Sequence, residues 1–519
     1  MELLMLFLRV MLTVALLGLI SVLFKLCDAL ALKPRRLRSI LQKQSISGPT
    51  PSFLLGNIPD MVKKQPTVSK PPQEDEDKGM IHNCPPLIFP HLVQWSKEYG
   101  PKFVFSLGNI PFLYLNEPEV LKEFSKYTPL NIGKPCYVKA MFDPLVGTGI
   151  AHANGTAWAH QRKLIAPEFF MDKVKGMTKL MVESAATTVV KPWHSLIEIE
   201  GGVADVIIDN YMTNFSRNVI SRLCFGNNHS EGEQIFLKLK ALEEIMSKQG
   251  PLYGAFPMLR YIPTESNRET SKLKKESRAL ILKMINERKD KTTDKDLLQL
   301  ILEAAEKSGL SKDATESFVV DNCKTMYLAG YDTTASSAMW VLMLLASNPI
   351  WQAKAREEVL QICGGQMPDN EMLPKMKTLT MVIQESLRLY PPAPVITREA
   401  LEDVKFCGVH VPKGVNIWIL TIALHYDPEI WGPDVNKFNP ERFANGVSGS
   451  CKLPHVYVPF GAGPRVCLGQ HFAMAELKIL LALILSNFSF SLSPKYKHSP
   501  VIKVVMGPKD GMNLIIRKL

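Results

Sequence analysis

The hydrophobic pattern of the chain opens with an almost unbroken apolar run over residues 3–24. About 20 apolar residues are enough to cross a hydrocarbon core of roughly 30 Å as a helix. Arg9 interrupts the run near one end, where a long side chain can reach the polar interface. We therefore expect a transmembrane anchor over residues 1–25. A cleaved signal peptide is the alternative, but no small-residue cleavage site follows the run.

Two later stretches repeat their apolar positions at helical spacing. The first extends from about Ser311 to Asn348, where Pro349 stops it. At 1.5 Å per residue, this helix would span on the order of 55 Å, the thickness of a whole domain. The second helix is expected directly after Gly469. Its apolar positions are Phe472, Leu477, Leu480, Leu481 and Ile484.

The stretch that follows the apolar run differs from the rest of the chain in composition. It begins with basic residues, continues through a turn-rich Gly/Pro sequence, and ends in a proline-containing segment with an acidic run at residues 74–77. This composition predicts a basic, proline-containing hinge and a flexible loop over residues 26–90. Because no Gly/Ser linker or internal repeat follows, we expect one large domain over residues 91–519.

The chain carries a net charge of +11, from 61 Lys and Arg against 50 Asp and Glu. Much of the excess follows the apolar run, and basic flanks mark the cytosolic side of an anchor. Without a basic stripe interleaved with aromatic residues we expect no nucleic-acid binding; anionic membrane lipid and an acidic partner protein explain the charge better. The nine cysteines have no CxxC or zinc spacing, which predicts a reducing compartment without disulfides.

The strongest candidate chemistry is a single thiol in a glycine-rich turn. Cys467 comes just before the predicted helix, where free backbone N–H groups and the helix dipole favour a thiolate. Gly461 and Gly463 allow backbone angles closed to other residues, and Gly469 leaves room for a flat partner. Arg465 offers a cation to a carboxylate on that partner. A lone cysteine is more often a small buried hydrophobe, but this context favours a metal ligand.

This turn resembles the haem-thiolate loop of the cytochrome P450 monooxygenases, F-x-x-G-x-R-x-C-x-G. The matching residues are Phe460, Gly463, Arg465, Cys467 and Gly469. By this resemblance Cys467 is the axial ligand of the iron of haem b, and the other four help to bind the cofactor. A thiolate ligand pushes electron density onto the iron and favours O–O cleavage. The resemblance also implies a mainly α-helical fold with a smaller β part, preceded by a single N-terminal transmembrane helix.

The middle of the predicted long helix holds the sequence Ala-Gly-Tyr-Asp-Thr-Thr at residues 329–334. Glycine costs roughly 1 kcal/mol in a helix interior and threonine is also unfavourable, so helix propensity is given up here. A threonine hydroxyl can bond to the carbonyl one turn earlier and bend the helix. The sequence resembles the family's A-G-x-D-T-T signature, which makes Asp332 and Thr333 the catalytic acid and alcohol of proton delivery. A packed helix with two incidental threonines is the alternative.

A pair of charged residues lies near the end of another predicted helix. Glu385 and Arg388 are three residues apart, so they share a helix face and can pair. An E-x-x-R sequence arises by chance in many helices. It resembles the family's motif here because Arg442 follows in Pro-Glu-Arg-Phe. By that resemblance Glu385, Arg388 and Arg442 form a structural ion-pair network behind the haem-thiolate loop.

Three further residues are assigned to the cofactor by resemblance. Trp158 and Arg162 match the family's W-x-x-x-R, whose indole N–H and guanidinium reach a haem propionate. Arg398 stands where another propionate contact is usual. With Arg465 they would hold a dianionic cofactor through charge-assisted hydrogen bonds. For an isolated Trp/Arg pair, a surface cation–π contact is the alternative.

The finer resemblance is to plant membrane-bound enzymes. Residues 157–163 and 425–433 resemble the branch that oxidises gibberellins and triterpenoids. This implies an endoplasmic-reticulum enzyme with a cytosolic domain that uses O2 and takes electrons from NADPH through NADPH-cytochrome P450 reductase. The implied reaction inserts one oxygen atom into a hydrophobic polycyclic terpenoid, most simply by hydroxylation. The pocket would be lined by a loop over residues 134–150, by residues 327–334 and 393–397, and by the C-terminal loop near Met506.

Two alternatives come from other functional classes. A reductase-independent haem-thiolate isomerase or dehydratase would use Cys467 but would not need Asp332 and Thr333. A non-catalytic haem-binding membrane sensor would keep the ligand and need no electron supply.

Overall fold

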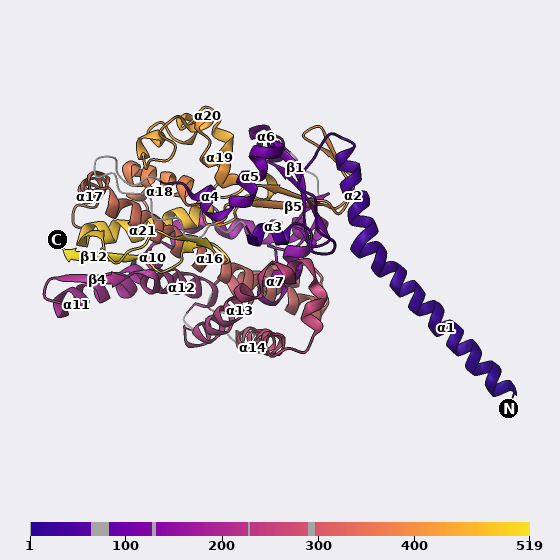
Figure 1. The fold of residues 1–519 in the computed structure, drawn as a ribbon. Coiled ribbons are helices and arrows are strands. Elements are labelled where there is room, and N and C mark those ends of the chain that lie inside the picture. The colour runs from indigo at the N-terminus through magenta and orange to yellow at the C-terminus, as the bar shows by residue number, and fades with distance from the viewer. Residues whose placement is uncertain (1, 64–81, 127–130, 227–228, 289–295) are drawn as a thin grey trace.

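The computed structural model describes residues 2–63, 82–126, 131–226, 229–288 and 296–519, and helices dominate it (Figure 1). The α-helices are α1 (Glu2–Cys27), α2 (Lys33–Gln42), α3 (Ile58–Lys63), α4 (Cys84–Ile88), α5 (Pro90–Tyr99), α6 (Pro118–Lys126), α7 (Cys136–Val146), α8 (Gly155–Ile165), α9 (Met171–Gly176), α10 (Thr178–Ala185), α11 (Lys191–Ile199), α12 (Asp209–Phe225), α13 (His229–Ala255), α14 (Glu265–Arg288), α15 (Leu297–Lys307), α16 (Lys312–Ser347), α17 (Pro349–Cys363), α18 (Lys377–Leu389), α19 (Thr421–His425), α20 (Pro428–Trp431) and α21 (Gln470–Asn487). The predicted fold class, mainly α with a smaller β part, is confirmed.

The strands form small sheets. They are β1 (Lys102–Leu107), β2 (Ile110–Leu115), β3 (Ile132–Gly133), β4 (Val203–Ile207), β5 (Ile396–Ala400), β6 (Val404–Phe406), β7 (Val409–Val411), β8 (Asn416–Ile419), β9 (Phe488–Leu492), β10 (Pro500–Ile502), β11 (Met506–Pro508) and β12 (Asn513–Lys518). The largest sheet has five strands in the order β1-β2-β8-β5-β3, with only β2 and β8 parallel among its pairs. A three-stranded sheet has the order β4-β12-β9.

The N-terminal apolar run forms a helix that projects away from the domain (Figure 1). α1 buries none of its residues, and helical structure continues through a short π-turn into α2, so that 41 residues from Glu2 to Gln42 are helical. In the described part of the chain this is the one helix long and apolar enough to cross a membrane. An exposed apolar helix of this length is consistent with the predicted single anchor.

The described part of residues 26–90 packs onto the domain. Leu37 and Leu41 of α2 are buried beside the largest sheet. Arg38 is also buried, and its guanidinium donates to the carbonyl oxygens of Gly48 at 3.1 Å and Pro49 at 2.8 Å. The predicted flexible loop falls mainly on residues 64–81, outside the described residues. The domain boundaries at residues 25 and 90 stay predictions.

The long central helix follows its sequence signals. The Ser311 hydroxyl caps α16 by accepting from the Ala314 N–H at 3.4 Å, and the helix ends at Ser347 before Pro349 opens α17. From Phe318 onward most of its side chains are buried, because α16 packs against α12 on one side and α21 on another. The predicted helix over residues 311–348 is confirmed within a residue at each end. The helix predicted after Gly469 is α21.

Candidate functional site

The glycine-rich turn before α21 holds Cys467 by backbone hydrogen bonds. The Cys467 N–H donates to the Phe460 carbonyl at 2.9 Å, and the Val466 N–H donates to the Gly463 carbonyl at 3.0 Å. Gly463 has a φ of 69°, and a Cβ there would lie 2.6 Å from the Phe124 carbonyl oxygen. A side chain at this position is therefore excluded both by the backbone angle and by the lack of space.

Cys467 lines an internal cavity of about 390 Å³ between α16, α21 and the glycine-rich turn over residues 460–469, called the thiol turn below. A Cβ built on Gly469 would meet no atom within 4 Å, so the surface beside the sulfur is open for a flat ligand. The other walls are mainly apolar and come from distant parts of the chain. They include Ile150, Phe169, Ile220, Met326, Val395 and Leu477.

The electrostatics of Cys467 favour a bound cation. Burial raises the pKa of the thiol, whereas the backbone N–H of Gly469 and the Arg162 guanidinium lower it. Arg162 is held in place because it donates to the Val466 carbonyl at 2.9 Å. A thiolate in this cavity lacks the hydration that it would have in water, and a metal ion bonded to the sulfur would replace that lost stabilisation.

Four cationic side chains line one end of the same cavity: Lys134, Arg162, Arg398 and Arg465. Burial and the charge of Arg465 lower the pKa of Arg398 to about 9. Burial, then Arg398 and Arg465, lower the pKa of Lys134 to about 7. No carboxylate of the described residues forms an ion pair with any of the four. The cluster lacks its counter-charge, and a dianionic ligand would supply it.

The indole of Trp158 lies among these cations. The guanidinium carbon of Arg465 is 4.5 Å from the ring centroid and that of Arg162 is 5.9 Å away. Arg465 also donates to the Ala153 carbonyl at 2.8 Å and to Asn154 Oδ1 at 2.9 Å. The structure therefore brings Trp158, Arg162 and Arg465 together in the cavity wall.

Lys134 is a candidate that sequence motifs do not indicate. It directly follows β3, which pairs with β5 so that Gly133 is opposite Glu399. Continuing that antiparallel register places Lys134 opposite Arg398. Only the strand pairing brings the lysine to the cation cluster, because the two residues are far apart in sequence. The Lys134 backbone is fixed from both sides, since its N–H donates to Asn154 Oδ1 at 2.7 Å and its carbonyl accepts from Asn154 Nδ2 at 2.9 Å.

The central helix α16 places Thr333, but not Asp332, in the cavity wall. The Thr333 hydroxyl donates to the Ala329 carbonyl at 2.7 Å, as expected for a threonine one turn later, and α16 stays continuous there. Asp332 does not line the cavity wall. Burial and repulsion from Glu243 raise the pKa of Asp332 to about 7, and Lys503 partly offsets the shift.

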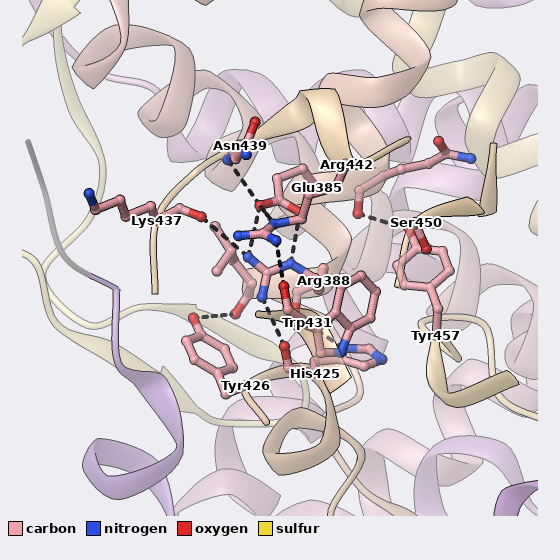
Figure 2. Close-up of polar contacts among 12 residues, drawn as sticks. Glu385, Arg388, His425, Tyr426, Trp431, Lys437, Asn439, Arg442, Ser450 and Tyr457 are labelled. Carbon is pink, nitrogen blue, oxygen red and sulfur yellow. Dashed lines mark hydrogen bonds and ion pairs between the residues drawn. The ribbon is translucent and has the colours of Figure 1, made fainter. Parts of the chain in front are cut away.

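Figure 2 shows the ion-pair network of Glu385, Arg388 and Arg442. Arg388 and Glu385 are both fully buried and make two hydrogen bonds, at 2.7 Å from Nε and 2.8 Å from Nη2. Arg442 Nε lies 3.5 Å from Glu385 Oε1, and Arg442 Nη2 pairs with Asp434 at 2.6 Å. The structure thus brings all three predicted residues together and adds Asp434, which no motif indicated.

A buried histidine connects this network to the thiol turn. Arg388 donates to the His425 carbonyl at 2.8 Å. Burial and the nearby Arg388 charge lower the pKa of His425 to about 3, so the ring is neutral. His425 Nε2 accepts from the Val458 N–H at 3.2 Å, next to the turn. The Tyr457 hydroxyl adds a second link by donating to the Gln384 carbonyl at 2.9 Å. Glu385 and Arg388 therefore position the start of the turn.

The structure corrects part of the predicted pocket lining. Residues 136–146 form α7, so most of the expected loop over 134–150 is helical. Tyr327 is fully buried against Phe225 and lies outside the cavity wall. Met506 is buried as well, and its carbonyl accepts from Trp340 Nε1 at 3.0 Å. Side-chain direction around a helix decides which residues reach the cavity, and sequence position alone does not give it.

A family model described as Cytochrome P450 matches residues 85–514, and the chain belongs to this family of haem-thiolate monooxygenases. It is 46% identical over 493 residues to Cytochrome P450 714C2 of Oryza sativa subsp. japonica, covering 94% of both chains. It is 44% identical over 516 residues to Cytochrome P450 714B3 of Zea mays, covering 98% of this chain and 96% of that protein. It is 42% identical over 510 residues to Cytochrome P450 714A2 of Arabidopsis thaliana, covering 96% of both. The predicted likeness to plant P450 enzymes is confirmed.

The residues present fit the haem that the family implies. The thiol turn offers a sulfur beside an open surface, and the uncompensated cations fit two propionates. The roles assigned to individual residues stay predictions.

We expect Glu385→Ala to strand the fully buried charge of Arg388 at a cost of about 3–5 kcal/mol. The variant should lose haem and unfold at a markedly lower temperature, measured by the haem-to-protein ratio and by thermal unfolding. Glu357→Ala removes an exposed carboxylate from α17 and serves as the matched control. Equal stability of the two variants would contradict a structural role for the network.

We expect Lys134→Met to weaken haem retention. A charge-assisted hydrogen bond contributes about 1.5–3 kcal/mol, so haem transfer to an acceptor protein should become roughly ten- to hundredfold easier. Lys134→Arg should retain haem, and Lys139→Met, which removes an exposed cation from α7, should behave as wild type. If Lys134→Met also behaves as wild type, Lys134 does not contact the cofactor.

Proposed function

We propose that this P450 is an endoplasmic-reticulum enzyme that inserts one oxygen atom from O2 into a polycyclic terpenoid, most simply as a hydroxyl group. NADPH would supply electrons through NADPH-cytochrome P450 reductase. The observation that carries the proposal is the cavity that combines the Cys467 sulfur, the uncompensated cations and the Thr333 hydroxyl. Its mainly apolar walls suit a hydrophobic substrate better than a polar one.

Cys467 would ligate the haem iron, and Trp158, Arg162, Arg398, Arg465 and Lys134 would hold the propionates. When bound, the haem supplies the activation and cleavage of O2, which a thiolate ligand favours. The side chains of the protein would position the reacting groups and supply protons. Thr333 holds its hydroxyl at the cavity wall through the 2.7 Å bond to Ala329. Asp332, with a pKa of about 7, keeps a proton close to this helix turn near neutral pH.

The substrate class rests on the plant P450 branch. Residues 157–163 and 425–433 resemble enzymes that oxidise gibberellins and triterpenoids, and the curated relatives are P450 714 proteins of rice, maize and Arabidopsis. We therefore propose a gibberellin-type diterpenoid or a pentacyclic triterpenoid as substrate.

The location and partners follow from the anchor and the charge. The exposed basic residues after α1 would face the cytosol and anionic lipid, which would leave the catalytic domain where the reductase is found. A reductase-independent isomerase or dehydratase would not use Thr333, and a sensor would not consume NADPH.

Microsomes that contain this chain and a plant reductase should convert one of the proposed terpenoid classes to a product with one added oxygen atom. The measurement is mass-resolved product formation with NADPH and isotopically labelled O2, over a panel of gibberellins, their precursors and triterpenoid acids. Label in the product establishes monooxygenation. An unlabelled isomer formed without NADPH would favour the isomerase, and spectral binding without NADPH consumption would favour the sensor.

We expect Thr333→Ala to bind haem normally but to form less product per NADPH consumed. Loss of a positioned proton-transfer group costs on the order of 10²-fold. Thr333→Ser should recover much of the yield because it keeps the hydroxyl. The matched control is Thr325→Ala, since Thr325 lines the cavity and donates to Asp321 O at 2.7 Å in the same way. Equal losses at both positions would assign Thr333 a packing role.

A further inference from the structure

A second, smaller cavity of about 220 Å³ lies between α12, α13 and α16, and is called the polar cavity below. Neighbouring residues on these helices divide between the two cavities: Ile220 and Met326 line the cavity of Cys467, whereas Ser221 and Tyr327 line the polar cavity. The two cavities are therefore separate sites, and the polar cavity has room for several water molecules or a polyatomic ion. Its polar side chains include Arg217, Asn218, Ser221 and Arg222 of α12, Glu233 of α13 and Tyr327 of α16.

The phenol of Tyr327 points to a missing ligand in this cavity. The residue is fully buried, and its hydroxyl has no hydrogen-bond partner among the described residues. Its ring is fixed between two aromatic neighbours, with centroid distances of 5.9 Å to Phe225 and 6.1 Å to Phe236. Burial raises the pKa of Tyr327, so the hydroxyl keeps its proton and is available as a donor. A buried donor without an acceptor is costly, and an acceptor bound in the cavity would remove that cost.

Arg217 brings a weakly paired cation to the same cavity. Its guanidinium carbon lies 4.7 Å from the Phe236 ring centroid, which holds the side chain in place. Nη1 of Arg217 lies 3.6 Å from Oε1 of Glu233, whose side chain is 59% exposed. This separation is too long for a hydrogen bond, and an ion pair with an exposed carboxylate contributes little. An anion in the cavity would therefore replace Glu233 as the partner of Arg217 at small cost.

The other groups of the wall add donors rather than acceptors. Arg222 is held by Glu183, since its Nη2 donates to Oε2 of that residue at 2.7 Å. Asn218 accepts from the Ser184 hydroxyl through Oδ1 at 2.8 Å, which turns its Nδ2 donors to another partner. Against these donors, the described lining residues include one carboxylate, that of Glu233. Water donates as readily as it accepts, so a wall of this composition favours a ligand that mainly accepts.

We propose that the polar cavity is a binding site for a tetrahedral oxyanion of the class of phosphate and phosphate monoesters. The guanidinium of Arg217 would bind two of its oxygens, a geometry that suits phosphate. The Tyr327 hydroxyl of α16 and the Asn218 amide of α12 would donate to the remaining oxygens. A carboxylate has two oxygens in one plane, so it satisfies donors on two helices less completely. The site does not depend on the terpenoid reaction, because it shares no lining residue with the cavity of Cys467.

The first test uses the haem-loaded, full-length protein in an uncharged detergent, with inorganic phosphate as the probe and sodium chloride to keep the ionic strength constant. Calorimetric titration should show saturable phosphate binding, and phosphate should raise the unfolding temperature because it binds the folded state. Acetate should bind more weakly. Absence of saturable phosphate binding would overturn the proposal, and so would acetate binding of equal strength.

Two variants then locate the bound anion. Arg217→Gln should weaken phosphate binding by about tenfold, and Tyr327→Phe, which removes only the unpartnered hydroxyl, should weaken it by about fivefold. The matched control is Arg278→Gln on α14, which removes another partly exposed arginine whose Nη2 lies 3.8 Å from Glu316. This control should bind phosphate like the wild type, and the haem absorption spectrum reports whether each variant is folded. Phosphate binding that is unchanged in both cavity variants would overturn the assignment of the site.

Discussion

The site depends on a group of positively charged side chains that have no carboxylate partner among the described residues. Lys134, Arg162, Arg398 and Arg465 line one cavity, and burial lowers the pKa of each. Such a cluster is costly in a protein without a ligand, since its charges repel and have lost hydration. If these residues hold the haem propionates, as proposed, binding of the dianionic cofactor would turn that cost into affinity. Haem binding and fold stability would then be coupled.

The neighbouring network of Glu385, Arg388 and Arg442 differs from this cluster because its buried charges are paired within the protein. Arg388 donates both to Glu385 and to backbone carbonyls, and neutral His425 continues the network to the thiol turn. The paired charges of this network and the unpaired cations of the cavity have different consequences. The paired charges hold the thiol turn in place when no ligand is bound. The unpaired cations give the cavity affinity for an anionic ligand.

The local parts of the site were predictable from the sequence. The Cys467 turn, the Glu385–Arg388 pair and the Thr333 hydroxyl bond each depend on residues within one turn or one helical repeat. Lys134 was predicted only as the first residue of a pocket-lining segment, and its place beside Arg398 was not, because strand register brings the two together. In the fold, the anchor and the ends of α16 follow from apolar runs, Ser311 and Pro349. The pocket lining was partly wrong, because helix rotation decides which side chains face a cavity.

Helix geometry also bears on the proposed roles of Asp332 and Thr333 in proton delivery. Successive residues on an α-helix project about 100° apart, so Asp332 can point away from a cavity that Thr333 lines. In the structure Thr333 lines the cavity wall and Asp332 does not. A carboxylate inside an apolar cavity beside a thiolate would add a second buried negative charge. Keeping the acid out of the cavity wall, one residue from the alcohol, avoids that repulsion.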